Sequence, residues 1–366
     1  MSGRPSVVVA AVGDPESPAT WSGTTAGVLA GLRELGATAH GLDLTLARGI
    51  EQATLAAGAA PSRNRYDAHS ARLTMTLRSL KAGRRLRELG ADGAIQVGTT
   101  FSLPRELPFV TLEDMTLRQA ASIHPVFGRM SRAAVEGWER RRARIYEQAR
   151  MCCVASRWVA DSLIADYGIA PERIAVVGLG ANHRLEAVRE RAWSPARFLF
   201  VGVEWERKGG PLLLRAFARL REHHPDASLD LVGGHPHVEQ PGVRLHGMLS
   251  RGSARDRELI ADLFGRASCF VMPSSVEPFG IVHVEAASAG TPSIATSVGG
   301  PRDVLGADGG LVVDPGDEDG LVEAMCRMAE PETARRMGEA ARERSRLYTW
   351  TNVAERLLRA LALGAA

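Results

Sequence analysis

Residues 269–300 read CFVMPSSVEPFGIVHVEAASAGTPSIATSVGG. The apolar run 269–272 predicts a short buried strand, residues 273–275 end it, and a helix is expected from about Gly280. A second apolar run at 293–295 predicts the next strand. This order is typical of a βαβ unit, whose helix N-terminus faces the carboxyl ends of the strands. Ligands of open α/β sheets bind at that edge, where free backbone N–H groups favour phosphate oxygens.

Two glutamates accompany this expected helix. Glu277 lies just before it and Glu285 lies within it, with seven residues between them. Carboxylates accept charge-assisted hydrogen bonds from hydroxyl groups, whereas backbone amides and a nearby cation hold a diphosphate. The two side chains can therefore reach different parts of one elongated ligand such as a sugar nucleotide. An ordinary α/β crossover with solvated glutamates is the alternative interpretation.

The stretch closely resembles the retaining glycosyltransferases of family 4, whose motif reads EPFG-x4-E-A-x-A-x-G-x-P. The positions that match are Glu277, Pro278, Phe279, Gly280, Glu285, Ala286, Gly290 and Pro292. So many matches within sixteen residues are far more specific than a lone glycine motif. The resemblance covers residues 197–330 well and the first half of the chain only by the order of its elements. It implies an α/β protein of the GT-B fold, with two Rossmann-like, doubly wound domains facing a central cleft.

A basic turn precedes this stretch by about sixty residues. Residues 198–201 predict a strand, Gly202 begins a polar turn, and residues 207–210 read Arg-Lys-Gly-Gly before an apolar-periodic helix. A cation and two flexible residues above a sheet edge suit a diphosphate. Relatives usually have an arginine after the first glycine, where this chain has Val203, and Arg207 is the expected second positive charge. A surface Arg–Lys pair is the alternative.

The resemblance also implies residue roles in the site. Glu285 is expected to hold the ribose diol of the donor, and Glu277 to lie by the donor sugar. Lys208, helped by Arg207, is expected to neutralise the leaving diphosphate in place of a metal ion. The other donor-binding positions expected in this half are Gly202, Phe279, Gly280, Ile281 and Val282.

The first half of the chain supplies two further sets of candidates. Relatives often have a glycine-bearing loop at the edge of the cleft, and Gly23 and Thr24 are the matching positions, although a simple turn before a helix explains them equally well. The strand expected at 109–112 ends in Glu113 and Asp114, where relatives commonly have a His-Asp pair beneath the transferred sugar. Glu113 therefore introduces a carboxylate, expected to be anionic, where an imidazole is usual. We place both residues among the catalytic candidates.

Length and composition indicate a two-domain globular protein. The chain has 366 residues, of which 45% are hydrophobic and 24% charged, and each domain is long enough to bury a core. We expect an N-terminal acceptor domain at 1–185, to which a C-terminal helix at 350–366 packs back, and a donor domain at 186–349. Of 45 basic residues only Lys81 and Lys208 are lysines, so either could be chemically required or retained by chance.

Charge and cysteine content limit the partners. A net charge of +3 with few aromatic residues among the basic ones does not predict nucleic-acid binding. Cys152, Cys153, Cys269 and Cys326 form no CxxC pair, which favours buried free thiols in a reducing cytosol. No secretory signal and no run of 18 apolar residues is found. The expected location is therefore cytoplasmic.

Four other segments invite an interpretation. Residues 48–66 are rich in Ala, Gly and Ser and predict an unpatterned excursion, whereas 68–89 predict an amphipathic helix. The basic run 129–150 is either a peripheral contact to an anionic membrane, as in some members of the family, or a solvated helix face. The Asp-Glu-Asp triplet at 317–319 matches a metal-binding DxD literally, but it opens an expected helix, where carboxylates favour the N-terminus.

The sequence thus predicts a retaining glycosyltransferase. The expected donor is a UDP- or GDP-sugar, the acceptor is a hydroxyl of a small molecule or of a lipid-linked compound, and no cofactor or metal is expected. Another GT-B enzyme, such as an epimerase or a phosphorylase, and a non-catalytic nucleotide-sugar binding protein are the alternatives. The base, the sugar, the acceptor and the oligomeric state are not predicted.

Overall fold

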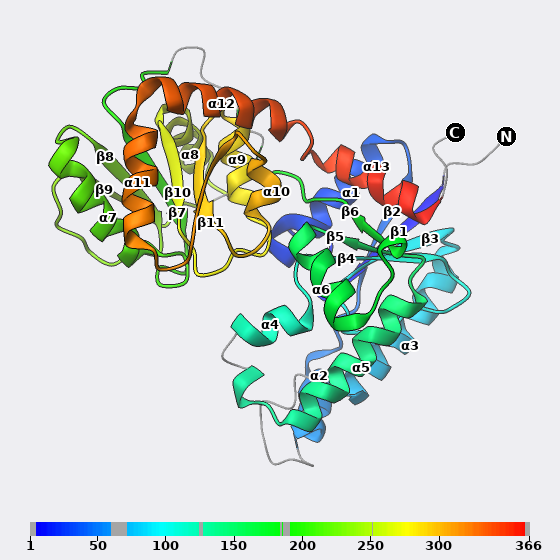
Figure 1. The fold of residues 1–366 in the computed structure, drawn as a ribbon. Helices are drawn as coiled ribbons and strands as arrows, with labels where there is room; N and C mark the ends of the chain where they lie inside the picture. Colours follow the sequence, from blue (N-terminus) through cyan, green and yellow to red (C-terminus); the bar gives the residue numbers. More distant parts are fainter. Residues whose placement is uncertain are drawn as a thin grey trace. The chain divides into compact units, whose positions relative to one another are not determined.

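Two parallel sheets organise the chain in the computed structural model, which describes residues 5–59, 72–123, 127–183, 185, 191–250 and 252–362 (Figure 1). The contacts within the chain divide it into two units. The first unit comprises Met1–Gly180 together with Thr349–Ala366, and the second comprises Ala181–Tyr348. Each unit is a six-stranded sheet covered by helices, as expected for the GT-B fold.

The first sheet has the strand order β2-β1-β3-β4-β5-β6, with all neighbours parallel. Its strands are β1 (Ser6–Ala11), β2 (Thr38–Asp43), β3 (Gly93–Val97), β4 (Phe109–Glu113), β5 (Met151–Val154) and β6 (Ile174–Val176). The chain passes from β1 to β2 on one side and then to β3 on the other. The loops after β1 and β3 therefore flank the point at which the strand order reverses, where open α/β sheets bind ligands.

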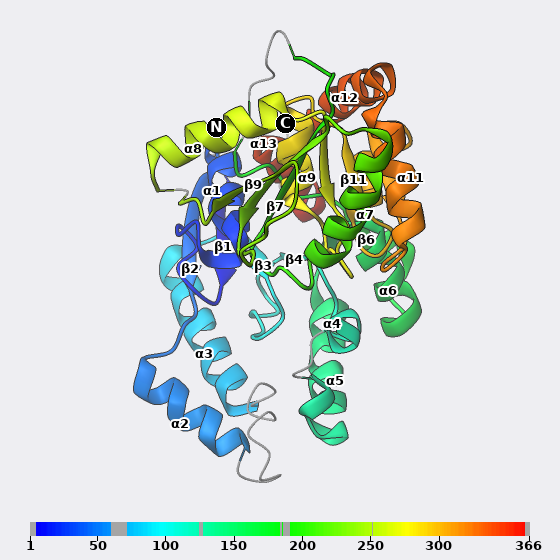
Figure 2. The same cartoon turned by 90° about the vertical axis from the view of Figure 1, so that its left-hand side faces the viewer.

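The helices of the first unit include one, at residues 48–59, that the sequence did not predict. They are α1 (Thr24–Glu34), α2 (Arg48–Ala59), α3 (Arg72–Leu89), α4 (Leu117–Ile123), α5 (Arg132–Gln148), α6 (Arg157–Tyr167) and α13 (Trp350–Leu361), with 3-10 turns at Thr20–Gly23, Phe127–Arg129 and Pro171–Arg173. The expected excursion at 48–66 is wrong over 48–59, which form α2 beside α3 (Figure 2); residues 60–66 lie outside the described residues. Ser156 occupies the N-cap position of α6, but its hydroxyl makes no capping hydrogen bond.

The second sheet has the order β12-β11-β10-β7-β8-β9 and is also parallel. Its strands are β7 (Arg197–Gly202), β8 (Ser228–Gly233), β9 (Val243–Gly247), β10 (Cys269–Met272), β11 (Ser293–Thr296) and β12 (Gly310–Val313). Its helices are α7 (Gly210–His223), α8 (Ala254–Arg266), α9 (Ile281–Ser288), α10 (Pro301–Leu305), α11 (Glu318–Ala329) and α12 (Pro331–Ser345). Here the strand order reverses between β7 and β10.

Buried apolar side chains explain why these segments form central strands. β3, β8 and β10 are buried along their whole length, as is usual for parallel strands with helices on both faces. In the second unit, α7 and α11 lie side by side on one face of the sheet (Figure 2). Among the described helices, none combines the length and the hydropathy that crossing a bilayer would require.

Candidate functional site

Lys208 and Glu277 meet at the reversal point of the second sheet. Lys208 lies in the turn between β7 and α7, and Glu277 lies in the loop between β10 and α9. Because β7 and β10 are neighbours in the sheet, their carboxyl ends bring the two loops together. An ion pair joins the Lys208 ammonium to the Glu277 carboxylate, and their side chains are 15% and 11% exposed.

Two glycines make room for the lysine. A Cβ atom on Gly202 would lie 3.3 Å from Cγ of Lys208, so the bare backbone at 202 lets the lysine stem pass close by. Gly209 has a φ of +78°, and a Cβ there would lie only 2.1 Å from the carbonyl oxygen of Pro273. Only glycine adopts that backbone readily at so close an approach. The basic turn therefore lies directly against the start of the glutamate loop.

Hydrogen bonds fasten the two loops to each other. The amide of Ser275 donates to the carbonyl oxygen of Arg207 at 2.8 Å, and Nη1 of Arg207 donates to the carbonyl oxygen of Val276 at 3.0 Å. The amide of Glu277 donates to the carbonyl oxygen of Val298 at 3.1 Å, and the amide of Gly300 donates to the carbonyl oxygen of Glu277 at 3.0 Å. Hydrogen bonds of both its amide and its carbonyl group therefore fix the backbone of Glu277. The orientation of its carboxylate depends on the neighbouring charged side chains.

Arg207 is the second positive group beside Glu277. Its Nη1 lies 4.0 Å from Oε2 of Glu277, and its Nε donates to Glu204 at 2.9 Å. The side chain is 24% exposed. Three charged groups of mixed sign thus surround a point at the sheet edge, where an arriving diphosphate could replace the glutamate as the partner of the two cations.

The helix that follows supplies the remaining donor-binding candidates. Gly280 precedes α9 in a left-handed conformation, with a φ of +88°, and the first amides of a helix have no intrahelical acceptor. Ile281 and Val282, which open the helix, are partly exposed. Glu285 is 4% exposed one turn further, and Phe279 is buried against Tyr348 with ring centroids 5.8 Å apart. Phe279 therefore anchors the loop, whereas the helix start is open to a ligand.

His283 was not among the sequence candidates, although it lies in the same helix turn. Its side chain is 1% exposed, and burial together with the Lys208 charge lowers its pKa to about 3. The sequence contained no signal for it, because His283 lies at a variable position within the motif.

In the first unit, Gly23 and Thr24 lie where the loop after β1 enters α1. Trp21, Ser22 and Gly23 all have positive φ angles, of 49°, 54° and 87°. Successive left-handed residues turn neighbouring amides to one side and can form an anion-binding concavity. Gly23 is the N-cap residue of α1, and Thr24 is buried at its first position.

Glu113 lies at the end of β4 and is 2% exposed. Burial raises the pKa of its carboxyl to about 7, against the opposing charge of Arg142 and with a contribution from Asp114. Near neutral pH a large fraction of this carboxyl is therefore protonated, rather than fully anionic as the sequence suggests. Asp114, the next residue, is partly exposed.

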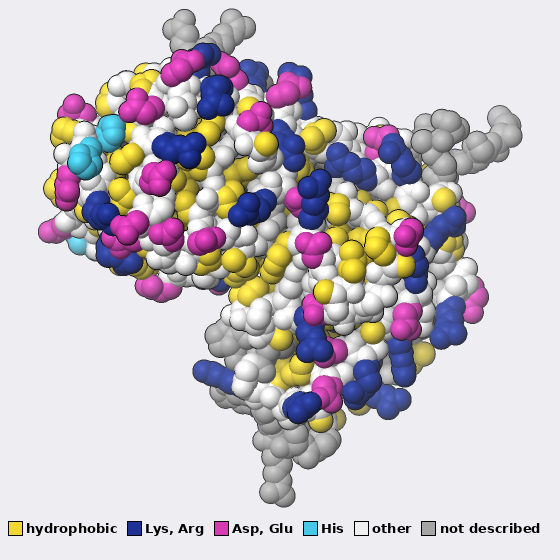
Figure 3. Space-filling view, in the orientation of Figure 1, with side chains coloured by type: hydrophobic (Ala, Val, Ile, Leu, Met, Phe, Trp, Pro, Cys, Tyr) yellow, Lys and Arg dark blue, Asp and Glu magenta, His cyan; other side chains and the backbone are white. Residues whose placement is uncertain are grey.

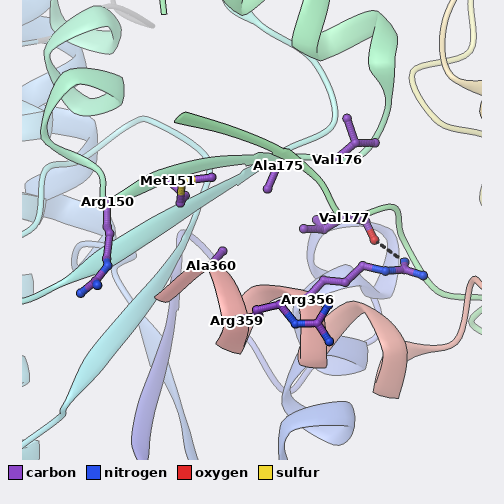
Figure 4. A pocket seen from close by; sticks show the side chains of 8 residues that line it. All are labelled: Arg150, Met151, Ala175, Val176, Val177, Arg356, Arg359 and Ala360. Atoms are coloured by element: carbon purple, nitrogen blue, oxygen red, sulfur yellow. Dashed lines mark hydrogen bonds between the residues drawn. The ribbon is translucent and has the colours of Figure 1, made fainter. Parts of the chain in front are cut away.

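A separate pocket of about 440 Å³ lies in the first unit between the second half of α13 and strands β5 and β6 (Figure 4). Its lining residues are Arg150, Met151, Ala175, Val176, Val177, Arg356, Arg359 and Ala360. Arg356 spans it and donates to the carbonyl oxygen of Val177 at 2.8 Å (Figure 4). Because it contains no carboxylate and none of the candidate residues, this pocket is separate from the candidate site.

The acidic triplet at 317–319 forms the N-cap and the start of α11. Asp317 is its N-cap residue and accepts a hydrogen bond from the amide of Gly320 at 2.9 Å, as the expected helix start requires. Glu318 and Asp319 form ion pairs with Arg215 and Arg219. The described residues contain no group of three or more His, Cys, Asp or Glu side chains arranged to hold a metal ion.

Comparison with known proteins also indicates a glycosyl transferase. A model of the family "Glycosyl transferases group 1" matches residues 186–344. Glycogen synthase of Mycobacterium tuberculosis is 30% identical over 310 residues, which cover 77% of this chain and 72% of that protein. MMP alpha-(1->4)-mannosyltransferase of Mycolicibacterium hassiacum is 29% identical over 227 residues, covering 60% of this chain and 55% of the relative.

The fold is likewise shared with solved structures. Sucrose-phosphate synthase of Thermosynechococcus elongatus superposes with a TM-score of 0.68 at 19% identity, covering 96% of each chain. A glycosyltransferase of Rickettsia africae superposes with a TM-score of 0.65 at 16% identity, covering 99% of this chain and 98% of the other. Together with the identity to glycogen synthase over most of its length, these matches show that the chain belongs to the group 1 glycosyl transferases and has the GT-B fold.

Proposed function

We propose that this enzyme is a retaining hexosyltransferase of family 4 that moves a sugar from a UDP- or GDP-sugar to an acceptor hydroxyl. The observation that carries the proposal is the Lys208–Glu277 ion pair beside the open N-terminus of α9. In the donor complex, Lys208 and Arg207 turn to the diphosphate and Glu277 accepts from sugar hydroxyls. Glu285 accepts from the ribose diol.

Charge neutralisation is the catalytic contribution proposed for this site. Negative charge develops on the diphosphate as the sugar leaves, and a preorganised cation stabilises it without reorganisation. We propose that Lys208, Arg207 and the first amides of α9 provide this stabilisation, so that no metal ion or other cofactor takes part. For residues of the first unit, we propose that Gly23 and Thr24 take part in donor binding and that Glu113 and Asp114 take part in catalysis.

The acceptor is proposed only as a class, a small-molecule or lipid-linked hydroxyl, because the relatives act on different acceptors, as their names glycogen synthase and MMP mannosyltransferase indicate. We further propose a cytoplasmic location, supported by four free cysteines, of which Cys152, Cys153 and Cys269 are buried.

Contact with an anionic membrane through α5 is a weaker proposal. Arg132 and Arg140 pair with Glu136 within the helix, and Arg142 is buried. On the face shown in Figure 3, basic and acidic side chains are interspersed rather than segregated. Sedimentation with phosphatidylglycerol vesicles, compared with phosphatidylcholine vesicles, would detect such a contact.

The first experiment is thermal-shift screening against UDP, GDP, ADP and dTDP, followed by sugar-transfer assays with donors of the nucleotide that binds. A ligand that binds only the folded state raises the melting temperature. The expected result is a shift with UDP or GDP that Glu285→Ala abolishes, then transfer with retained anomeric configuration by NMR. Binding without transfer would favour the non-catalytic alternative, and no shift with any nucleotide would favour a phosphorylase.

A further inference from the structure

His283 is enclosed by groups of the candidate donor site. Its imidazole packs edge-on against Phe270 of β10, with ring centroids 5.0 Å apart. A Cβ atom placed on Gly280 would lie 2.7 Å from Cδ2 of His283 and 3.3 Å from Cγ of Glu277. The ring and the glutamate stem therefore flank the same glycine, and the Lys208 ammonium is close enough to act on the charge of the ring.

The surroundings do not explain why this residue is polar. Neither ring nitrogen of His283 has a hydrogen-bond partner among the described residues, and the side chain is 1% exposed. A buried polar group without partners destabilises the fold, whereas an apolar side chain of similar size would fill the space without that penalty. An unpartnered buried group in a native structure calls for another role, and a functional site is where such groups occur.

The ring is a hydrogen-bond acceptor because it is neutral. Burial and the neighbouring ammonium both disfavour the imidazolium, so one of the two nitrogens carries no proton. Lys208 has three N–H donors, and the hydrogen bond to Glu277 uses one of them. Once a diphosphate attracts the ammonium, the bond to Glu277 is weakened and the ammonium requires other acceptors to fix its position.

We propose that His283 is a positioning residue of the donor site, whose unprotonated nitrogen accepts a hydrogen bond from Lys208 when that ammonium turns from Glu277 to the diphosphate. The imidazole thereby orients the lysine on the leaving group and leaves Glu277 free for the hydroxyls of the sugar. This inference rests on the donor site proposed above and adds to it a residue at one of the unspecified positions of the family motif.

The test is a double-mutant cycle on nucleotide affinity in the full chain. Isothermal titration with UDP and with GDP is carried out on wild type, His283→Leu, Lys208→Ala and the double variant, with exposed His237→Leu as control. His283→Asn and His283→Gln keep an acceptor near the position of either ring nitrogen. We expect His283→Leu to weaken nucleotide binding about tenfold. One of the two amide variants should bind the nucleotide within about twofold of the wild-type affinity. In the Lys208→Ala background, His283→Leu should cause no further loss of affinity.

Other outcomes separate this inference from the proposed function. Wild-type affinity in His283→Leu, equal losses in all three His283 variants, or additive losses with Lys208→Ala would each overturn the positioning role while leaving the donor site intact. Failure of wild type to bind either nucleotide would overturn the donor site itself, and the positioning role with it. Folding does not confound the comparison, because leucine removes an unpartnered polar ring, and the melting temperature of His283→Leu is expected to equal or exceed that of wild type.

Discussion

Lys208 and Lys81 are the two lysines of the chain, and their surroundings differ. Lys208 is paired with Glu277 at the reversal point of the second sheet, whereas Nζ of Lys81 donates to the carbonyl oxygen of Thr45 at 2.7 Å in the first unit. If Lys208 stabilises the leaving diphosphate, Lys208→Ala should lower kcat by roughly 10²–10³-fold. Steady-state transfer assays check this, with Lys81→Ala as the matched control, expected to keep wild-type turnover. A loss below about tenfold for Lys208→Ala would contradict the role.

Glu113 gives the stability of the protein a specific pH dependence. Its carboxyl has a pKa of about 7 in the folded protein and an ordinary value of 4.5. The folded state therefore binds this proton more tightly than the unfolded state does. The stabilisation of the fold by the protonated Glu113 carboxyl is complete below pH 4.5 and is lost as the pH rises through about 7. The full loss corresponds to about 3 kcal/mol of unfolding free energy.

Glu113→Gln should remove this loss. Guanidinium unfolding at pH 5 and pH 8 should show the variant gaining stability relative to wild type between the two conditions, by up to about 3 kcal/mol. An equal pH dependence in both proteins would show that the carboxyl ionises normally.

The sequence alone could not predict such properties of single residues. The pKa of Glu113 depends on burial and on the charge of Arg142, and the pKa of His283 depends on burial and on the charge of Lys208. Each pair is distant along the chain, so no local pattern reports it. The neighbourhood of Lys208 and Glu277 is different, because both follow apolar runs that predict strands, and parallel strands bring their carboxyl ends to one edge.

At the scale of elements, Trp350 packs α13 against α1 where three glycines leave room for it, two of them in α1 and one at residue 180. A Cβ atom on Gly27 would lie 2.1 Å from the indole, one on Gly31 would lie 2.2 Å from the Trp350 carbonyl oxygen, and one on Gly180 would lie 2.6 Å from the ring. The tryptophan thus occupies a recess that only glycines leave open. The sequence signals neither the recess nor its occupant, because the two helices are separated by most of the chain.

Gly27→Ala should therefore destabilise the protein by about 1–3 kcal/mol, through overpacking against the indole. In the Trp350→Ala background the same substitution should be neutral or stabilising, because the ring is gone and alanine favours the helix. Denaturant unfolding of the four proteins measures this coupling. Gly49→Ala in α2, where a Cβ would meet no atom within 4 Å, is the control; a loss in it as large as that in Gly27→Ala would exclude the steric explanation.

Arg191 binds the ends of two helices of the second unit. Its guanidinium donates to the carbonyl oxygens of Gly265 and Gly290 at 2.8 and 2.7 Å, and also to those of Phe264 and Ala289. These are the last groups of α8 and the residues that follow α9, so one side chain satisfies both helix ends.

Arg191→Ala is expected to cost about 2–4 kcal/mol of unfolding free energy, because several buried carbonyl groups lose their donors. Arg191→Lys should recover little of it, since an ammonium cannot reproduce the fork of donors. Thermal unfolding compares both with Arg335→Ala, whose exposed ion pairs on α12 predict a change below about 1 kcal/mol. Recovery of full stability by lysine would show that charge alone matters.

The elements that the sequence predicted correctly are those with strong apolar runs, such as β4, β7 and β10. β2 and α2 were missed because tertiary contacts outweigh their weak local patterns. β2 reads TAHGLD and owes its place to pairing with β1. α2 is fixed on α3 by the Thr54–Thr74 hydroxyl bond of 2.9 Å and by the Glu51–Arg78 ion pair.

For the whole molecule, the repeated strand–helix order and the motif at 277–292 predicted the GT-B fold, which the two parallel sheets and the solved relatives confirm. The sequence places the domain boundaries after residues 185 and 349, whereas the structure has them after Gly180 and Tyr348, and residues 349–366, which include α13, belong to the first unit. The donor and acceptor roles of the two units stay predictions.

Truncation after Tyr348 tests this division. Loss of α13 uncovers part of α1 and of β3, β4 and β5, so hydrogen exchange should show amides of β3, β4 and β5 losing protection. Strands β7, β8 and β10 of the second unit should keep theirs. A chain ending at Ala362, which retains α13, is the control. Equal loss of protection in both units would mean that they fold as one cooperative body.

Because the second unit is inserted within the sequence of the first, the two units can be completed in only one order during translation. Polypeptide emerges from the amino end, and domains form as units once all their parts are available. The second unit can be completed when residue 348 has left the exit tunnel, whereas the first waits for α13 to fill the glycine recess on α1. The half of the enzyme that is translated first is therefore the half that matures last, and until α13 is made the surfaces of α1, β3, β4 and β5 that it covers stay exposed.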